Sequence, residues 1–155
     1  MSVPVLQKLR PVLSALCFVL LIAGAAHAQA LESLAVVGRD GQRHVFQVEV
    51  ARNDADRAQG LMFRRSMPAN QGMLFDFGRV EPVSMWMQNT YLPLDMLFIR
   101  PDGTIARIAA NTEPLSTRTI SSGEPVLGVL ELNAGTAAKL GIRAGDRVEH
   151  PVFMR

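Results

Sequence analysis

Short β-rich runs separated by turn residues follow one another through this chain, and two of them form a clear hairpin signal. The runs are LDMLFIR (94–100) and TIARIAA (104–110), and the tripeptide PDG (101–103) stands between them. Pro, Asp and Gly in this order favour a tight turn, so the two runs are predicted to pair as antiparallel strands. Strict alternation of strands and helices is missing from the chain, which argues against a doubly wound fold.

Other segments give the same kind of signal. In HVFQVEVA (44–51), Phe46, Val48 and Val50 alternate with polar residues, as in a half-buried strand. Short helices are predicted at NDADRAQG (53–60) and NAGTAAKLG (133–141), each closed by a glycine. Asp40-Gly41 and Gly145-Asp146 are further turn signals. We therefore expect a mainly β protein, a compact single-domain β-barrel or β-sandwich with six to eight short strands and two short helices.

The first residues have the composition of a secretory signal peptide. Lys8 and Arg10 precede the apolar residues 11–26, and alanines at 26 and 28 flank a cleavage site after residue 28, with a cut after Ala30 as the alternative. The apolar run is shorter than the ~20 residues that a membrane span needs. We expect residues 1–28 to be removed, residues 31–155 to form one β-rich domain, and the protein to be periplasmic or secreted without a stable membrane span.

Removal of the signal peptide changes both the charge and the cysteine content. Lys8 and Arg10 leave with it, so 14 basic and 14 acidic residues remain. The remaining chain has no stripe of lysine and arginine, and we expect no nucleic-acid partner. Cys17, the single cysteine, also leaves, which excludes disulfides and thiol catalysis in the mature protein.

Several short motifs occur in a fixed order along the mature chain. They are Arg57-x-x-Gly60-Leu61-Met62, Gly72-Met73-Leu74-Phe75, Trp86-Met87-x-Asn89-Thr90, Pro93-Leu94-Asp95, Leu130-Glu131-Leu132-Asn133-Ala134-Gly135 and Gly145-Asp146. In this combination the chain resembles the domain of unknown function 192 family of small bacterial and archaeal proteins, which are often secreted. The resemblance implies a single β-rich domain and no particular activity.

The polar residues at motif positions are the candidate site. They are Arg57, Trp86, Asn89, Thr90, Asp95 and Glu131. One interpretation is structural, with Asn89 and Thr90 capping a turn and Arg57 pairing with Asp95 or Glu131, because buried polar groups need partners. The other is a pocket for a sugar or another small polar ligand, with a tryptophan wall. The leading hypothesis is a binding module for a small ligand or a partner. We expect no cofactor, and the sequence does not determine the oligomeric state.

Two further functions compete with ligand binding. Asp95 and Glu131 could act as a general acid and base, which would make the protein a small periplasmic hydrolase. Met85 and Met87 flank Trp86, and paired thioethers can hold Cu(I), so a methionine-based Cu(I) carrier is the third candidate. Methionine is also a common filler of irregular cores, and no histidine or cysteine stands beside this pair. The sequence therefore predicts no metal site and leaves enzymatic activity open, with binding favoured.

Overall fold

The structure is a computed structural model that describes residues 30–154. The signal peptide predicted over residues 1–28 lies outside the described residues. Seven strands, two short helices and a 3-10 turn make up the described chain. They are β1 (Glu32–Val37), β2 (Arg43–Ala51), α1 (Asp54–Gln59), β3 (Gln71–Met85), β4 (Leu94–Ile99), β5 (Ile105–Ala109), β6 (Ile120–Asn133), α2 (Thr136–Leu140), β7 (Arg147–Glu149) and η1 (Pro151–Phe153).

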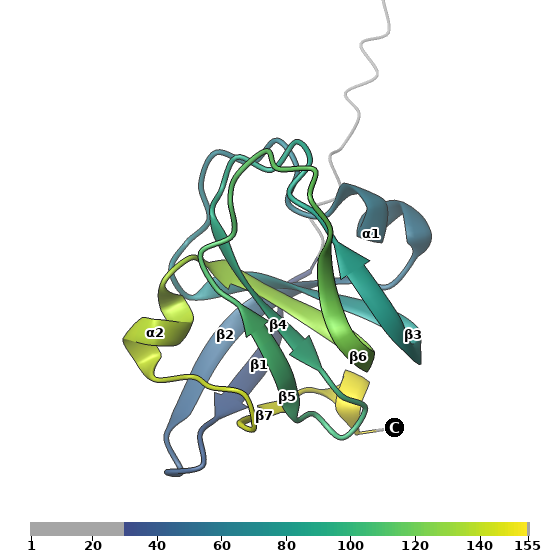
Figure 1. The fold of residues 1–155 in the computed structure, drawn as a ribbon. Coiled ribbons are helices and arrows are strands. Elements are labelled where there is room, and N and C mark those ends of the chain that lie inside the picture. Colours follow the sequence, from purple (N-terminus) through teal and green to yellow (C-terminus); the bar gives the residue numbers. More distant parts are fainter. Residues whose placement is uncertain (1–29, 155) are drawn as a thin grey trace, which may run out of the picture.

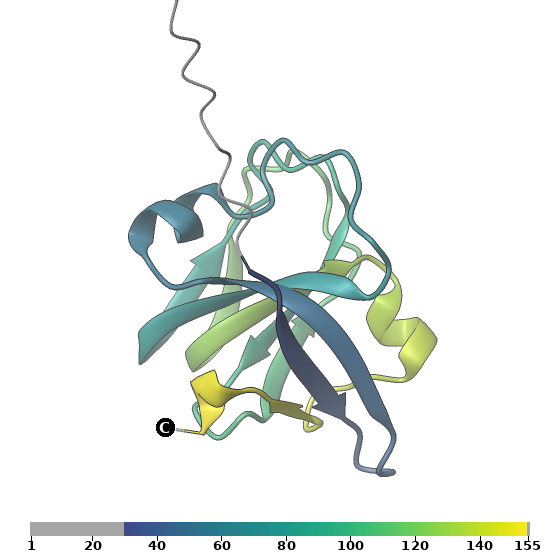
Figure 2. The same ribbon diagram turned by 180° about the vertical axis from the view of Figure 1, so that it is seen from behind.

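The strands form one curled sheet in the order β5-β4-β6-β3-β2-β1-β7. Neighbours pair antiparallel except β2 and β3, which run parallel and are joined through α1. The sheet curls into a half-barrel, with β4 and β5 on one side and β1 and β2 on the other (Figure 1, Figure 2). Its two edges meet where the Ile105 amide donates to the Asp146 carbonyl (2.8 Å). The expected mainly β single domain is confirmed, in the form of a half-barrel.

Two apolar cores lie on the two faces of the sheet. The first core receives side chains from all seven strands and fills the inside of the curl. Its fully buried residues include Leu74, Leu97 and Leu130. The second lies on the opposite face of β3, β4 and β6 and contains Met73, Met96 and other residues. Because successive side chains of a strand point to opposite faces, each of these central strands contributes to both cores.

The hairpin predicted around residues 101–103 is confirmed as β4 and β5, and the turn at Asp40-Gly41 joins β1 to β2. β3 includes both GMLFDF (72–77) and VSM (83–85), continues through bulges and ends at Met85. Residues 120–125 belong to β6, which begins at Ile120. Within residues 30–154, no helix has the length and apolar character needed to cross a membrane.

Candidate functional site

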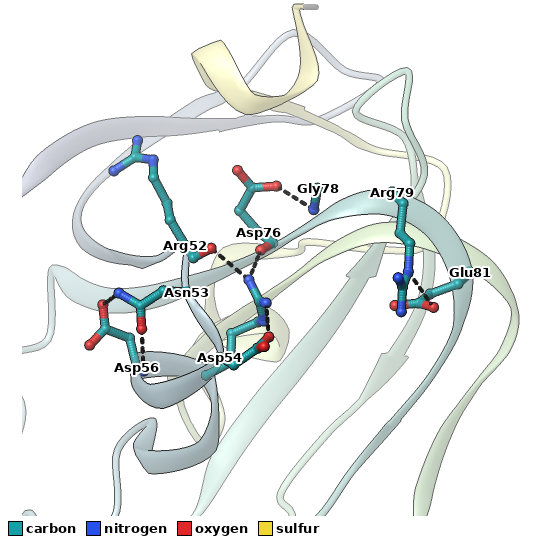
Figure 3. A network of polar contacts seen from close by, with 9 residues as sticks. Arg52, Asn53, Asp54, Asp56, Asp76, Gly78, Arg79 and Glu81 are labelled. Carbon is teal, nitrogen blue, oxygen red and sulfur yellow. Dashed lines mark hydrogen bonds and ion pairs between the residues drawn. The ribbon is translucent and has the colours of Figure 1, made fainter.

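The site begins at α1, which holds Arg57 over the edge of the sheet. Asn53 caps this helix by accepting a hydrogen bond from the Asp56 amide (2.9 Å), and Gly60 ends it with a positive φ of 48°, as expected from the sequence. The Arg57 guanidinium donates to the carbonyl oxygens of Arg52 (2.7 Å) and Asp76 (2.8 Å). It also forms an ion pair with the Asp54 carboxylate. Figure 3 shows this network around Arg52, Asp54 and Asp76.

An open cavity of about 240 Å³ lies between α1 and the end of β3. Its walls are mostly apolar, with the Arg57 guanidinium 5.8 Å from the centre of the Phe77 ring. Its lining residues are Arg57, Ala58, Phe75, Phe77, Ser84, Met85 and Trp86. Trp86 follows the last residue of β3 and is 54% exposed, which is unusual for so large an apolar side chain. A flat ligand in this cavity would cover the exposed indole.

A smaller extension of about 30 Å³ adjoins this cavity and reaches Glu131 of β6. It shares Arg57, Ala58, Phe75, Met85 and Trp86 with the outer cavity and adds Gln59, Gly60, Leu61, Met62, Thr90 and Glu131. A space of this size holds about one water molecule or a group of similar size. We call the outer cavity and its extension together the Trp86 pocket. Four of the six sequence-predicted residues therefore line one pocket: Arg57, Trp86, Thr90 and Glu131.

Glu131 is the most unusual group of the Trp86 pocket. It lies on β6 directly opposite Met73 of β3 and Met96 of β4, so thioether side chains flank it on its own face of the sheet. It is 4% exposed, and its carboxyl group has no hydrogen-bond or ion-pair partner among residues 30–154. Burial raises the pKa of Glu131 to about 8, because no nearby group compensates for the lost hydration of the charged form. The carboxyl group is therefore largely neutral at pH 7.

Thr90 and Asn89 form a turn at the rim of the pocket. The Thr90 hydroxyl donates to the Gln88 carbonyl (3.1 Å), and the Thr90 amide donates to the Met87 carbonyl (3.1 Å). Asn89 is exposed and has a positive φ of 55°, a conformation that asparagine tolerates better than most residues. Its carbonyl accepts from the Phe63 amide (2.8 Å), which ties this turn to the loop after α1. Asn89 supports the rim and does not line the pocket.

Asp95 lies away from the Trp86 pocket. It is fully buried at the start of β4, where Oδ1 accepts from the Asn111 amide and Oδ2 from the Ala137 amide, each at 2.9 Å. Ala137 belongs to the first turn of α2, whose N-cap, Gly135, has no side chain to supply an acceptor. Asp95 therefore supplies the missing capping oxygen from a neighbouring strand.

The register of β4 and β6 separates Asp95 from Glu131. Asp95 lies opposite Leu132, whereas Glu131 lies opposite Met96, so the two carboxyl groups are on opposite faces of the sheet. They do not form the acid and base pair of the hydrolase hypothesis. The ion pair expected between Arg57 and either acid is also absent from the described residues, because Arg57 pairs with Asp54.

Met85 and Met87 likewise separate, since β3 ends at Met85 and the alternation of a strand stops there. Met85 lines the Trp86 pocket together with Trp86, whereas a second cavity is lined by Met87. Met87 is fully buried, and its sulfur accepts a hydrogen bond from the Thr112 hydroxyl (3.2 Å). The two methionines therefore line different cavities.

Sequence reasoning missed the apolar walls of the pocket. Phe75 and Phe77 lie at every second position after Met73 on β3, which places them on the face that carries Glu131. That period of two was available in the sequence. Met62, by contrast, enters through a loop, and no local pattern predicts its position beside Trp86.

The fold and the Trp86 pocket define a class of protein: a small β half-barrel with an aromatic pocket that ends at a buried carboxyl group. A family model matches residues 35–150, and the chain belongs to the domain of unknown function 192 family, described as uncharacterised ACR. A comparison with curated proteins finds no match.

The solved structures that share the fold include the following two. A crystal structure from Sinorhizobium meliloti 1021, described as that of a candidate transcription regulator, is 54% identical in sequence with a TM-score of 0.77. It matches over 78% of this chain and 94% of that one. A protein of unknown function from Novosphingobium aromaticivorans DSM 12444 is 42% identical with a TM-score of 0.75, over 77% of this chain and 85% of that one.

Proposed function

We propose that this protein is an exported binding protein for a small molecule, which it holds in the Trp86 pocket. The observation that carries the proposal is the convergence of Arg57, Trp86, Thr90 and Glu131 from separate segments on one pocket. Glu131 has no hydrogen-bond partner there among the described residues, and burial makes its charged form costly. A ligand that supplies the missing partner would offset that cost. The ligand is of fragment size, since the outer cavity measures about 240 Å³.

Charge pairing on the surface argues against a nucleic-acid partner. Among residues 30–154, seven arginines form ion pairs with carboxylates: Arg43, Arg52, Arg57, Arg64, Arg79, Arg100 and Arg118. Proteins that bind phosphate backbones gather cations on one face, whereas here even Arg39, Lys139 and Arg143, which lie around one cavity, share it with Asp40 and Asp146. The description of the Sinorhizobium protein as a candidate regulator is therefore not extended to this chain.

Binding is tested with the mature protein and a library of small fragments, followed by two-dimensional NMR of the backbone and indole N–H groups. Trp86 is the only tryptophan, so its indole signal is unambiguous. We expect binding fragments to shift this signal together with the amides of Arg57 and Phe75. Trp86→Ala should weaken binding by about tenfold or more, since a buried aromatic contact commonly contributes over 1 kcal/mol. Phe63→Ala, which removes another exposed aromatic outside the pocket, is the matched control. Fragments that leave the Trp86 signal unchanged would contradict the proposal.

Export is tested by intact-mass analysis of protein produced in a Gram-negative host. The proposal predicts a periplasmic or secreted product that begins at Gln29 or Leu31, because alanines precede both positions. β1 begins at Glu32, so either cleavage leaves the described sheet complete. Cytoplasmic protein that retains Met1 would contradict this part of the proposal.

A further inference from the structure

We propose that the head group bound in the inner extension of the Trp86 pocket is a protonated primary amine, attached to a small flat ring that lies against Trp86. This inference rests on the proposed binding function and names the chemical class of its ligand.

Five residues of the lining of the inner extension carry electron-rich groups. Glu131 contributes a carboxyl group, and Met62 and Met85 contribute thioether sulfurs, which are weak acceptors. Phe75 and Trp86 contribute aromatic rings, whose faces carry partial negative charge and attract cations. A head group with several donors and a positive charge complements such a lining.

Two of the side-chain donors that line this extension, Arg57 and Thr90, are already engaged. Arg57 directs its N–H groups to the Arg52 and Asp76 carbonyls and to the Asp54 carboxylate. The Thr90 hydroxyl donates to the Gln88 carbonyl. An anionic head group would have to draw the Arg57 guanidinium away from these bonds, whereas an ammonium group needs only acceptors. A hydroxyl can bond to the neutral Glu131 carboxyl group, but only an ammonium group also gains an ion pair with the Glu131 carboxylate.

The dimensions of the pocket match an amine on a ring. The inner extension of about 30 Å³ accommodates one group the size of water, and an ammonium group is of that size. The outer cavity of about 240 Å³ leaves room for a single ring between Phe77, Met85 and Trp86. Insertion of the head group would bring its N–H donors to the partnerless Glu131 carboxyl group.

Binding of an amine is coupled to proton release from Glu131. Arg57 is the other charged residue in the pocket lining, and its charge is compensated by Asp54. On the strands beside Glu131, the facing residues Met73 and Met96 carry no charge. Burial keeps the carboxyl group largely neutral below pH 8, whereas an ammonium ion stabilises the carboxylate. Affinity should therefore rise as the pH increases from about 6 to about 8.

The test uses Trp86 fluorescence of the mature protein and two matched probes, phenethylamine and 2-phenylethanol, at about pH 6 and about pH 8. Phenethylamine should bind at least about tenfold more tightly than the alcohol at the higher pH. Its dissociation constant should fall by about tenfold or more between the two pH values, and the alcohol should show no such change. In Glu131→Gln, the advantage of the amine and its pH dependence should disappear. Glu113→Gln, a change in an exposed ion pair with Arg118, should behave as the wild type.

The outcomes separate this inference from the proposed function. Equal, pH-independent binding of the two probes would overturn the amine assignment and leave a binding pocket in place. If neither probe nor any library fragment perturbs Trp86, both proposals fail. The comparison of amine and alcohol on the wild-type protein decides the assignment even if Glu131→Gln does not fold.

Discussion

At the scale of single residues, Glu131 makes the stability of the fold depend on pH. Its pKa is about 8 in the folded state and close to the ordinary glutamate value of 4.5 when the chain unfolds, so the folded protein binds the proton more tightly. The stability that this proton binding contributes is fully present below about pH 4.5 and is lost as the pH rises through about 8. Over that range, wild-type protein should lose on the order of 3–5 kcal/mol relative to Glu131→Gln, which stays neutral. Urea unfolding of the two proteins at a series of pH values measures the difference.

Comparison with the Glu131→Gln variant is needed because His150 makes the stability of the fold rise with pH, whereas Glu131 makes it fall. This side chain is fully enclosed, and burial is the main cause that lowers its pKa, although Glu32 lies 3.2 Å from Nε2. Stability from neutral His150 is present above its ordinary pKa of about 6.5 and is lost as the pH falls. His150 is the same in both proteins, so its effect cancels in the difference. A difference between wild type and Glu131→Gln that stays constant with pH would contradict the assignment.

Asn89 gives a second prediction at this scale. Its φ of 55° is strained for residues with a Cβ atom, and its amide makes only a long contact with the Met62 sulfur (3.9 Å). Asn89→Ala should cost about 1 kcal/mol from the backbone, whereas Asn89→Gly should be close to neutral. Both changes remove the same side-chain contact, so the difference between their urea midpoints isolates the backbone term. Equal, large losses would show that the side chain itself stabilises the turn.

At the scale of elements, α2 depends on an acid from another part of the chain. Asp95 accepts from the first turn of this five-residue helix through a buried bond and from Asn111 through a partly buried one. Asp95→Ala leaves the Asn111 and Ala137 amides without an acceptor and should cost roughly 2–6 kcal/mol, from about 1–3 kcal/mol for each amide. Chemical denaturation measures this loss. Binding of small molecules in the Trp86 pocket should be unchanged in the folded variant, since Asp95 lies on the other face of the sheet. Retained stability together with lost binding would reverse this assignment.

Elements with local signals could be predicted from the sequence, and those defined by long-range pairing could not. Pro101, Asp102 and Gly103 fix a hairpin within a few residues, and Asn53 and Gly60 delimit α1 by their own backbone chemistry. β3 is different, because Gly78 adopts a positive φ in the middle of one long strand, a feature that resembles a strand boundary in sequence.

In the candidate site, too, some features could be predicted from the sequence and others could not. Its residue types were recognisable, and four of the six residues converge on the Trp86 pocket. The opposite faces of Asp95 and Glu131 depend on the register between β4 and β6. A shift of one residue would have placed Asp95 on the Glu131 face, and no local pattern in the sequence sets that register.

At the scale of the whole molecule, closure of the half-barrel depends on contacts between its first and last parts. β7 pairs with β1, and the bridge between Thr104 and Arg147 connects it to the β4–β5 turn. The Val148 amide donates to the Gly103 carbonyl (2.8 Å), which brings these two backbones together. Side chains of Val148 and Ile105 enter the inner core at this point, so closure and core packing support each other.

Gly103 and Gly41 provide a matched test of this closure. Both have a positive φ, 85° and 82°, so alanine at either position should cost about 1–2 kcal/mol from backbone strain. They differ in surroundings: a Cβ at Gly103 would lie 2.5 Å from the Val148 carbonyl oxygen, whereas one at Gly41 would meet nothing within 4 Å. Gly103→Ala should therefore lose a further ~1–3 kcal/mol, because the two edges must move apart. Equilibrium urea unfolding gives both values, and hydrogen exchange should show faster exchange of the Val148 amide in Gly103→Ala alone. Equal losses in the two variants would mean that the edges are not held together as described.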